Sequence, residues 1–98
     1  MNYEDGAAHP YYIAAPDYRE SSAGVRVMHR LCHMLNTQGL EAYVVGAEVF
    51  HPQLVTPCLD SKTSIRHRRE NRIPIAIYPD IITGNPLNAP VCVRYMLN

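Results

Sequence analysis

Small residues at the start of an amphipathic segment form the first place in this sequence that could contact a ligand. Ser22, Ala23 and Gly24 open a stretch with helical periodicity. A helix N-terminus presents unpaired N–H groups and a partial positive charge, and small side chains let a phosphate approach them. One glycine matches neither the G-x-G-x-x-G dinucleotide pattern nor the P-loop. The run is a candidate phosphate contact, and a plain helix start packed on a sheet is the alternative.

A carboxylate and a turn cluster form the second candidate. Asp80 follows the β-rich run Ile73–Tyr78, and Gly84 and Asn85 stand before Pro86. In an open α/β sheet, ligands bind beyond the carboxyl ends of the strands. Asp80, Gly84 and Asn85 are therefore candidate substrate contacts. The alternative is an ordinary turn whose local geometry Gly84 and Asn85 satisfy.

Two histidines one helical turn apart raise the question of a metal site. The i, i+4 spacing of His29 and His33 places both imidazoles on one helical face. Cys32 points away from them into the apolar arc of the same helix, and no third ligand with suitable spacing follows. We therefore expect no metal site and predict that both histidines face solvent.

Charged residues form two further groups. In the first loop, Asp17 and Glu20 could supply a general base for an acceptor hydroxyl, or they are ordinary exposed carboxylates. A basic cluster lies later in the chain and could face a phosphate, a lipid headgroup or an acidic partner. The alternative is a solvated helix face, since no aromatic residues alternate with the basic ones. The cluster comprises Lys62, Arg66, His67, Arg68, Arg69 and Arg72.

Composition and charge restrict the class of protein. With 47% hydrophobic and 18% charged residues, the chain is of the ordinary globular kind. Nine basic side chains balance nine acidic ones, so no global field attracts nucleic acid. No apolar run approaches the ~20 residues of a transmembrane helix, and the acidic first ten residues do not resemble a signal peptide. Three widely spaced cysteines without a C-x-x-C motif indicate free, mostly buried thiols. Because free thiols are typical of a reducing compartment, we expect a cytoplasmic protein.

Three short β-rich runs predict the strands that would position the candidate residues. They are Tyr11–Ala15, Glu41–Val45 and Ile73–Tyr78. A helical segment separates the first two, which is the order of a parallel βαβ unit. We expect a parallel sheet in which the first strand lies between the other two.

Three helices are expected to flank this sheet. The best defined has a cap at Ser21 or Ser22 and ends at Gly39. A short polar helix follows Asp60 or Ser61, and a last one begins at Ala89, with apolar positions at Val91, Val93, Tyr95, Met96 and Leu97. The predicted fold is α/β, an incomplete Rossmann-like parallel sheet of about three strands with flanking helices. We expect residues 1–98 to form one truncated Rossmann-like domain.

Two blocks of the sequence resemble bacterial glycosyltransferases of the GT-B, family 4-like type. Tyr12–Pro16 together with Ser22–Asn36 resembles their first β-α unit. Arg72–Ala89 is similar to a later strand-and-turn signature of a subset of these enzymes. Its string Tyr-Pro-acid, followed closely by Gly-Asn-Pro, makes it the more specific block. The resemblance spans roughly residues 11–98.

The resemblance implies the acceptor-side, N-terminal Rossmann-like domain of an enzyme that transfers a sugar from a nucleotide-sugar to a glycan or lipid-linked acceptor. By position, Ser22–Gly24 would lie near the donor diphosphate, and Asp80–Asn85 would line the acceptor side. The paired glycines usual in the first loop are reduced to Gly24 alone. The resemblance implies that the donor-binding domain lies outside this chain, so we expect no cofactor to be bound by this chain alone and assign no catalytic residue.

Three interpretations of function stay open. The chain is a piece of a glycosyltransferase that is inert alone, a subunit of an enzyme divided between two polypeptides, or a stand-alone α/β interaction or ligand-binding module without catalytic activity. Its apolar last segment has no later element to pack on. We therefore expect self-association or a second polypeptide there, and no nucleic-acid partner.

Overall fold

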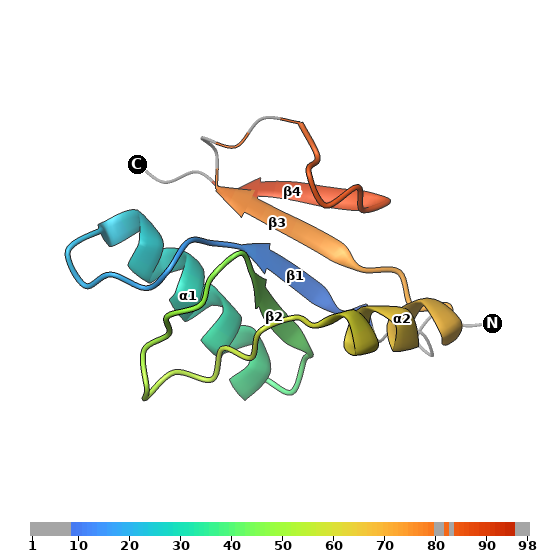
Figure 1. The fold of residues 1–98 in the computed structure, drawn as a ribbon, viewed down its shortest axis with the longest axis horizontal. Helices are drawn as coiled ribbons and strands as arrows, with labels where there is room; N and C mark the ends of the chain where they lie inside the picture. The colour runs from blue at the N-terminus through green and yellow to red at the C-terminus, as the bar shows by residue number, and fades with distance from the viewer. Residues whose placement is uncertain (1–8, 80–81, 83, 96–98) are drawn as a thin grey trace.

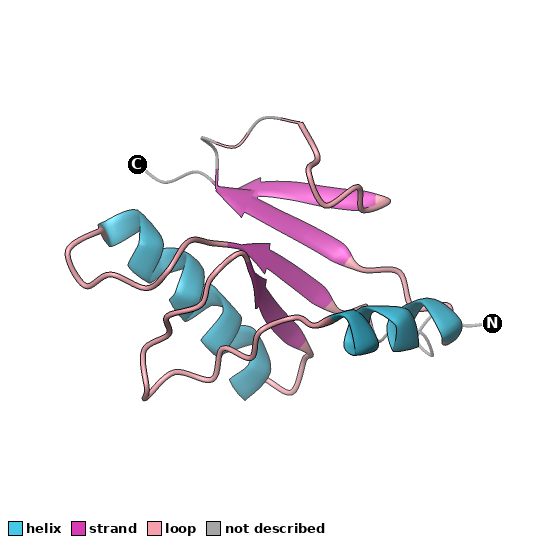
Figure 2. Cartoon of the chain, in the orientation of Figure 1, coloured by secondary structure: helices cyan, strands magenta, loops and turns pink. Residues whose placement is uncertain are grey.

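The described residues form a four-stranded sheet with two helices (Figures 1 and 2). The computed structural model describes residues 9–79, 82 and 84–95. The α/β class and the incomplete Rossmann-like sheet expected from the sequence are confirmed. In chain order the elements are β1 (Tyr11–Ala14), α1 (Ala23–Thr37), β2 (Ala42–Val45), α2 (Ser61–Arg69), β3 (Ile75–Pro79) and β4 (Val91–Tyr95).

All pairings within the described sheet are parallel, and the strand order is β2-β1-β3-β4. Ile13 of β1 stands opposite Val44 on one side and Ile77 on the other. The first strand therefore lies between the second and third, as predicted. This order follows from the βαβ arrangement, in which each helix carries the chain over a face of the sheet before the next strand begins.

The last described element is a strand, and the helix predicted from Ala89 is wrong. In the run Val91–Tyr95, valine and tyrosine alternate with Cys92 and Arg94, which is the period of two that a strand requires. The run pairs with β3 along its whole length, Ile75 opposite Val91 and onward. The free edge of β3 offers backbone partners to this segment, and the sheet has four strands rather than about three. Met96 and Leu97 lie outside the described residues.

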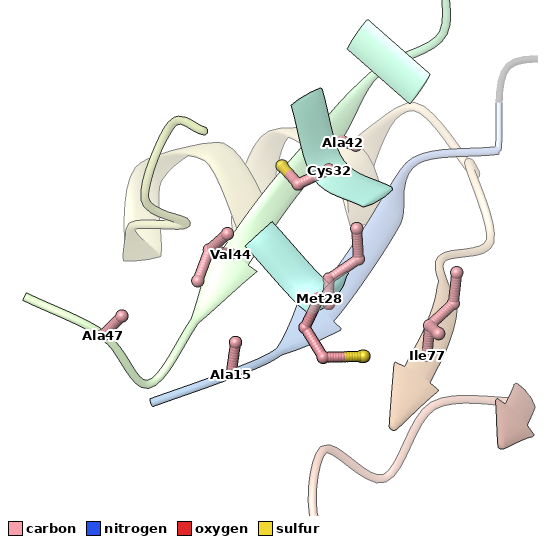
Figure 3. Close-up of a cluster of buried hydrophobic side chains, with 8 residues drawn as sticks. Ala15, Met28, Cys32, Ala42, Val44, Ala47 and Ile77 are labelled. Carbon is pink, nitrogen blue, oxygen red and sulfur yellow. The ribbon is translucent and has the colours of Figure 1, made fainter. Parts of the chain in front are cut away.

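Helix α1 covers one face of the sheet and packs mainly on β1 and β2. Ser22 caps its start by accepting a hydrogen bond from the backbone N–H of Val25. At its end Gly39 adopts a φ of +88°, and Leu40 donates back to the carbonyl of Leu35, which is a Schellman motif. Figure 3 shows the core that results between helix and sheet. Its buried members are Ile13, Ala15, Met28, Cys32, Ala42, Val44, Ala47 and Ile77.

The prediction that His29 faces solvent is wrong, because its side chain is fully buried. The loop after β1 folds back over α1, so that His29 Nε2 lies 2.8 Å from the carbonyl oxygen of Pro16. The rings of Tyr18 and Phe50 pack against the imidazole. His33 is half-buried, and its Nδ1 accepts from the N–H of Val55 at 2.9 Å. Both imidazoles thus fasten loops to the helix.

The three cysteines are unbridged, as predicted, but their burial differs from the expectation. Only Cys32 lies in the core, where burial raises the pKa of its thiol to about 12. Cys58 and Cys92 are exposed. Cys58 belongs to the irregular connection between β2 and α2, and Cys92 to the edge strand β4, so neither position is covered by a helix.

On the opposite face of the sheet, His67 of α2 packs against the rings of Tyr12 and Tyr43 at the amino edge. Ala76 and Tyr78 of β3 face the same side and pack with Leu87 and Ala89 of the connection between β3 and β4. Helix α2 begins at its cap Asp60, whose carboxylate accepts from the N–H of Thr63 at 2.8 Å. Among the described residues, no helix is long and apolar enough to cross a membrane.

Candidate functional site

The two loops singled out in the sequence follow neighbouring strands. From β1 the chain proceeds to β2 on one side of the sheet, and from β3 it proceeds to β4 on the other side (Figure 1). The carboxyl ends of β1 and β3 therefore form the topological switch point, where open α/β sheets bind ligands. Ser22–Gly24 stand at the end of the first loop, and Gly84 and Asn85 belong to the second. Asp80 lies outside the described residues.

At the first loop, the start of α1 has the geometry expected of a capped helix. Ser22 has an extended backbone, and its Oγ lies 3.3 Å from the backbone nitrogen of Val25. Ala23 and Gly24 form the first turn, which contains no acidic side chain. The positive end of the helix dipole is therefore not neutralised by a carboxylate of its own first turn.

At the second loop, Asn85 organises the return of the chain from β3 to β4. Its Oδ1 accepts from the hydroxyl of Tyr78 and, at 3.3 Å, from the N–H of Ala89. Its Nδ2 donates to the carbonyl of Ala89 at 2.7 Å. Parallel strands are usually joined through a helix. Here a side-chain amide holds a connection whose described residues, 82 and 84–90, form no helix. This is the structural role that the sequence left as the alternative for Asn85.

Gly84 lies beside Asn85 in the same connection and adopts a φ of +75°, which an L side chain rarely tolerates. Its carbonyl oxygen accepts from Arg94 of β4. Arg94 also donates to the carbonyl of Ile82 at 3.1 Å and lies 5.2 Å from the ring centre of Tyr78. The connection is thereby tied to both strands that it joins. Whether Gly84 also contacts a substrate stays a prediction.

Asp17 and Glu20, the carboxylates of the first loop, already have hydrogen-bond partners. Asp17 Oδ1 accepts from the N–H groups of Glu48 and Val49, at 2.6 and 3.1 Å, and so joins the loops after β1 and β2. Glu20 accepts from the hydroxyl of Tyr18 at 2.7 Å. Beside Asp17 lies an open hollow of about 560 Å³ at the carboxyl edge of the sheet.

A second polar region lies at the amino edge of the sheet, around Glu41. This carboxylate accepts from Arg66 at 3.2 Å, from Arg72, and from Nε2 of His67 at 2.8 Å. It also accepts from the hydroxyl of Tyr43. His67 has 1% of its surface exposed, so the solvated-face interpretation of the basic cluster is wrong for this residue. We call these residues, with Tyr12, the Glu41 cluster.

The protonation states within the Glu41 cluster follow from the charge of Glu41. Burial acts to raise the pKa of Glu41, but hydrogen bonds led by Tyr43 and Arg72 outweigh it and lower the pKa to about 2. Burial and the neighbouring carboxylate raise the pKa of Tyr43 to about 12. An ionised carboxylate can only accept. His67 therefore donates from Nε2 to Glu41, and its Nδ1 lies 2.7 Å from the hydroxyl oxygen of Tyr12.

No pattern local in the sequence indicates the Glu41 cluster. The hydrogen bonds of His67 join it to residues 26 and 55 positions away in the chain. The only sequence signal is the basic run on α2, together with an acidic residue directly before β2. Among the described residues, no group of three or more His, Cys, Asp or Glu side chains is placed to hold a metal ion.

A cavity of about 450 Å³ adjoins the Glu41 cluster, between α2 and the residues that precede β4. It lies at the opposite edge of the sheet from the switch point. Its wall is formed by Tyr12, Ser64, His67, Arg68, Asn71, Arg72, Ile73, Pro74, Leu87, Asn88, Ala89 and Pro90.

The chain was compared with protein families, curated proteins and solved structures, and none of them gives a significant match.

Proposed function

We propose that this chain is the acceptor-side, Rossmann-like part of a glycosyltransferase that transfers a sugar from a nucleotide-sugar to a glycan or lipid-linked acceptor. The observation that carries the proposal is the position of the two sequence blocks that resemble such enzymes. They are far apart in the chain, yet they supply the adjacent strands β1 and β3 and the loops that follow them. Ligands of open α/β sheets bind at such a switch point.

In this proposal the two loops have different roles. The N–H groups at the start of α1, at Ala23 and Gly24, face the donor diphosphate, and the absence of an acidic side chain in that first turn favours an anion there. Asp80, Gly84 and Asn85 lie on the acceptor side. The nucleotide and most donor contacts belong to a second Rossmann-like body, supplied by another polypeptide or by a longer chain.

The diphosphate contact is tested by titrating uridine diphosphate into the 15N-labelled chain. We expect weak, saturable shifts at the amides of Ala23 and Gly24. Ser22→Asp keeps a good N-cap but adds a negative charge, so it should weaken binding several-fold. Ser61→Asp adds the same charge at the start of α2 and should leave binding unchanged. Shifts that are absent at α1, or equal in both variants, would refute the contact.

Transfer itself should be absent from the isolated chain. Stabilising a transition state across a cleft requires groups on both walls, and this chain supplies one of them. Assays with a panel of nucleotide-sugars and glycan acceptors should show no turnover. Turnover that is lost on changing Ser22–Gly24 or Asp80 would show that the chain is catalytic alone and overturn the proposal.

A stand-alone interaction module is the second candidate, and the uncovered strand β4 favours it. Val91, Val93 and Tyr95 are 44, 48 and 40% exposed on the α1 face of the sheet, where α1 packs mainly on β1 and β2. Such a face at an edge strand is suited to self-association or to a second polypeptide. Light scattering should detect association, and Val93→Glu should abolish it. A monomer unaffected by this change would remove the support for that candidate.

A further inference from the structure

The asparagines of the described residues are used in two different ways. Asn36 engages both ends of its amide, since Oδ1 accepts from the N–H of Ala42 and Nδ2 donates to the carbonyl of the same residue. Asn85 holds Ala89 in the same way. The side chains of Asn71 and Asn88 have no hydrogen-bond partner within the described part of the chain, and both line the cavity at the amino edge. Their donors and acceptors are therefore open to a ligand.

The backbone at these two positions would accept glycine. Among the described residues, the non-glycine positions with positive φ are Asn71, at +58°, and Asn88, at +54°. Glycine enters this left-handed region without steric penalty, and asparagine is one of the few other residues found there. Asn71 also follows the end of α2, where helices commonly place a glycine. Each position thus carries an amide that the backbone does not require, and both amides line one cavity.

The rest of the lining is mostly apolar. Pro74 precedes β3, while Leu87 and Ala89 belong to the connection that leads into β4 (Figure 1). Ser64 of α2 adds a hydroxyl that, within the described residues, has no hydrogen-bond partner either. A concave, largely apolar space with a few polar groups is typical of small-molecule sites, and a volume of about 450 Å³ lies within their range.

The arginines of the lining do not call for an anion. Arg72 is paired with Glu41 and Glu70, so its charge belongs to the Glu41 cluster. Arg68 is exposed, and water screens its charge. The neutral polar groups therefore decide which ligand the cavity selects.

The amides of Asn71 and Asn88 define the chemistry of that ligand. A carboxamide presents a donor beside an acceptor. It pairs best with a group that offers the same two functions side by side, such as another carboxamide or the edge of a nucleobase. Asparagine binds adenine in this way, through N6 and N7. The apolar wall around Leu87 favours a ring as the body that carries this edge.

We propose that the cavity binds a neutral, ring-sized molecule whose edge carries a hydrogen-bond donor next to an acceptor, as a carboxamide or a nucleobase does. Asn71, Asn88 and Ser64 bind the polar edge, and the wall of Pro74 and Leu87 contacts the ring. The site lies at the opposite edge of the sheet from the donor diphosphate contact and does not depend on it.

Nicotinamide, a neutral ring with a carboxamide, is the probe, titrated into the 15N-labelled chain. We expect saturable shifts at the side-chain N–H groups of Asn71 and Asn88 and at the backbone amide of Ser64. N,N-dimethylnicotinamide lacks the N–H donors and acetamide lacks the ring, so each should bind several-fold more weakly. Adenine in a parallel titration distinguishes a nucleobase site from a carboxamide site, and tighter binding of either one supports the proposal. Equal binding of nicotinamide and its dimethyl derivative would refute the polar edge.

Two substitutions locate the binding within the chain. Asn88→Gly removes the amide and keeps a residue suited to positive φ, so it should weaken binding about fivefold while the unfolding midpoint changes little. Ser64→Ala should weaken binding by a similar factor. Ser61→Ala is its matched control, because Ser61 lies on the same helix and does not line the cavity. Shifts that do not saturate, or affinities that are the same in all three variants, would overturn the proposal.

Discussion

The two edges of the sheet use polar side chains in different ways. At the amino edge, Glu41 accepts hydrogen bonds from side chains of β2, of α2 and of the segment between α2 and β3. At the carboxyl edge, Asp17 joins the loops after β1 and β2 through backbone N–H groups, and in the connection between β3 and β4 Asn85 binds backbone groups of Ala89. A cluster that joins several elements contributes to the stability of the whole fold, whereas loop-shaping contacts leave a surface open to ligands.

The largest effect should come from Glu41→Gln. The substitution removes the charge that Arg72 and the buried His67 face, and we expect a loss of about 2–3 kcal/mol in the free energy of unfolding. Urea unfolding measures it. Glu70→Gln is the matched control, since Glu70 pairs with two of the same arginines but is more exposed, and it should cost less than about 1 kcal/mol. Equal losses would remove the distinction between the cluster and an ordinary surface pair.

Lowering the pH should reduce the free energy of unfolding through the same Glu41 cluster, by less than the Glu41→Gln substitution does. The pKa of Glu41 lies near 2 in the folded chain, below its ordinary value of 4.5. The stabilisation is therefore fully present above pH 4.5 and is lost as the pH falls toward 2. After allowance for solvent screening, we expect a loss of about 2 kcal/mol. Unfolding midpoints across this window should fall less steeply in Glu41→Gln, and identical profiles would assign the acid sensitivity to other carboxylates.

The smallest loss of stability is expected from substitutions in the connection between β3 and β4. Asn85→Ala should lose about 1–2 kcal/mol, because the contacts to Tyr78 and Ala89 disappear while the rest of the sheet is unchanged. Tyr78→Phe removes the same hydrogen bond from the other side. The double variant should therefore cost less than the sum of the single ones in thermal unfolding. Strict additivity would show that the two side chains do not act as a pair.

The sequence predicted the elements that local signals define. Ser22, Gly39 and Asp60 are where the helix caps were expected, and the runs that became β1, β2 and β3 carry the residues that strands favour. The position of β1 between β2 and β3 also followed, because the handedness of βαβ crossovers leaves few alternatives. The two loops at the switch point were predicted for the same reason.

Contacts between residues remote in the chain decided the structure of the last strand and the burial of His29. Val91, Val93 and Tyr95 alternate with Cys92 and Arg94 as in a strand, and pairing with the free edge of β3 fixes the strand. His29 is buried because the loop after β1 returns over α1.

Short-range periodicity and capping act over a few residues, so the amino-acid sequence by itself determined where the first five elements lie and how their strands are ordered. The Glu41 cluster and its cavity were decided only by the tertiary structure. Glu41, His67 and Tyr12 meet across the sheet, and their burial and the pKa of Glu41 depend on that meeting. The sequence gives no sign that Glu41 is anything but an exposed carboxylate. In the folded chain it accepts hydrogen bonds from four side chains, because their N–H and O–H groups replace the water around it.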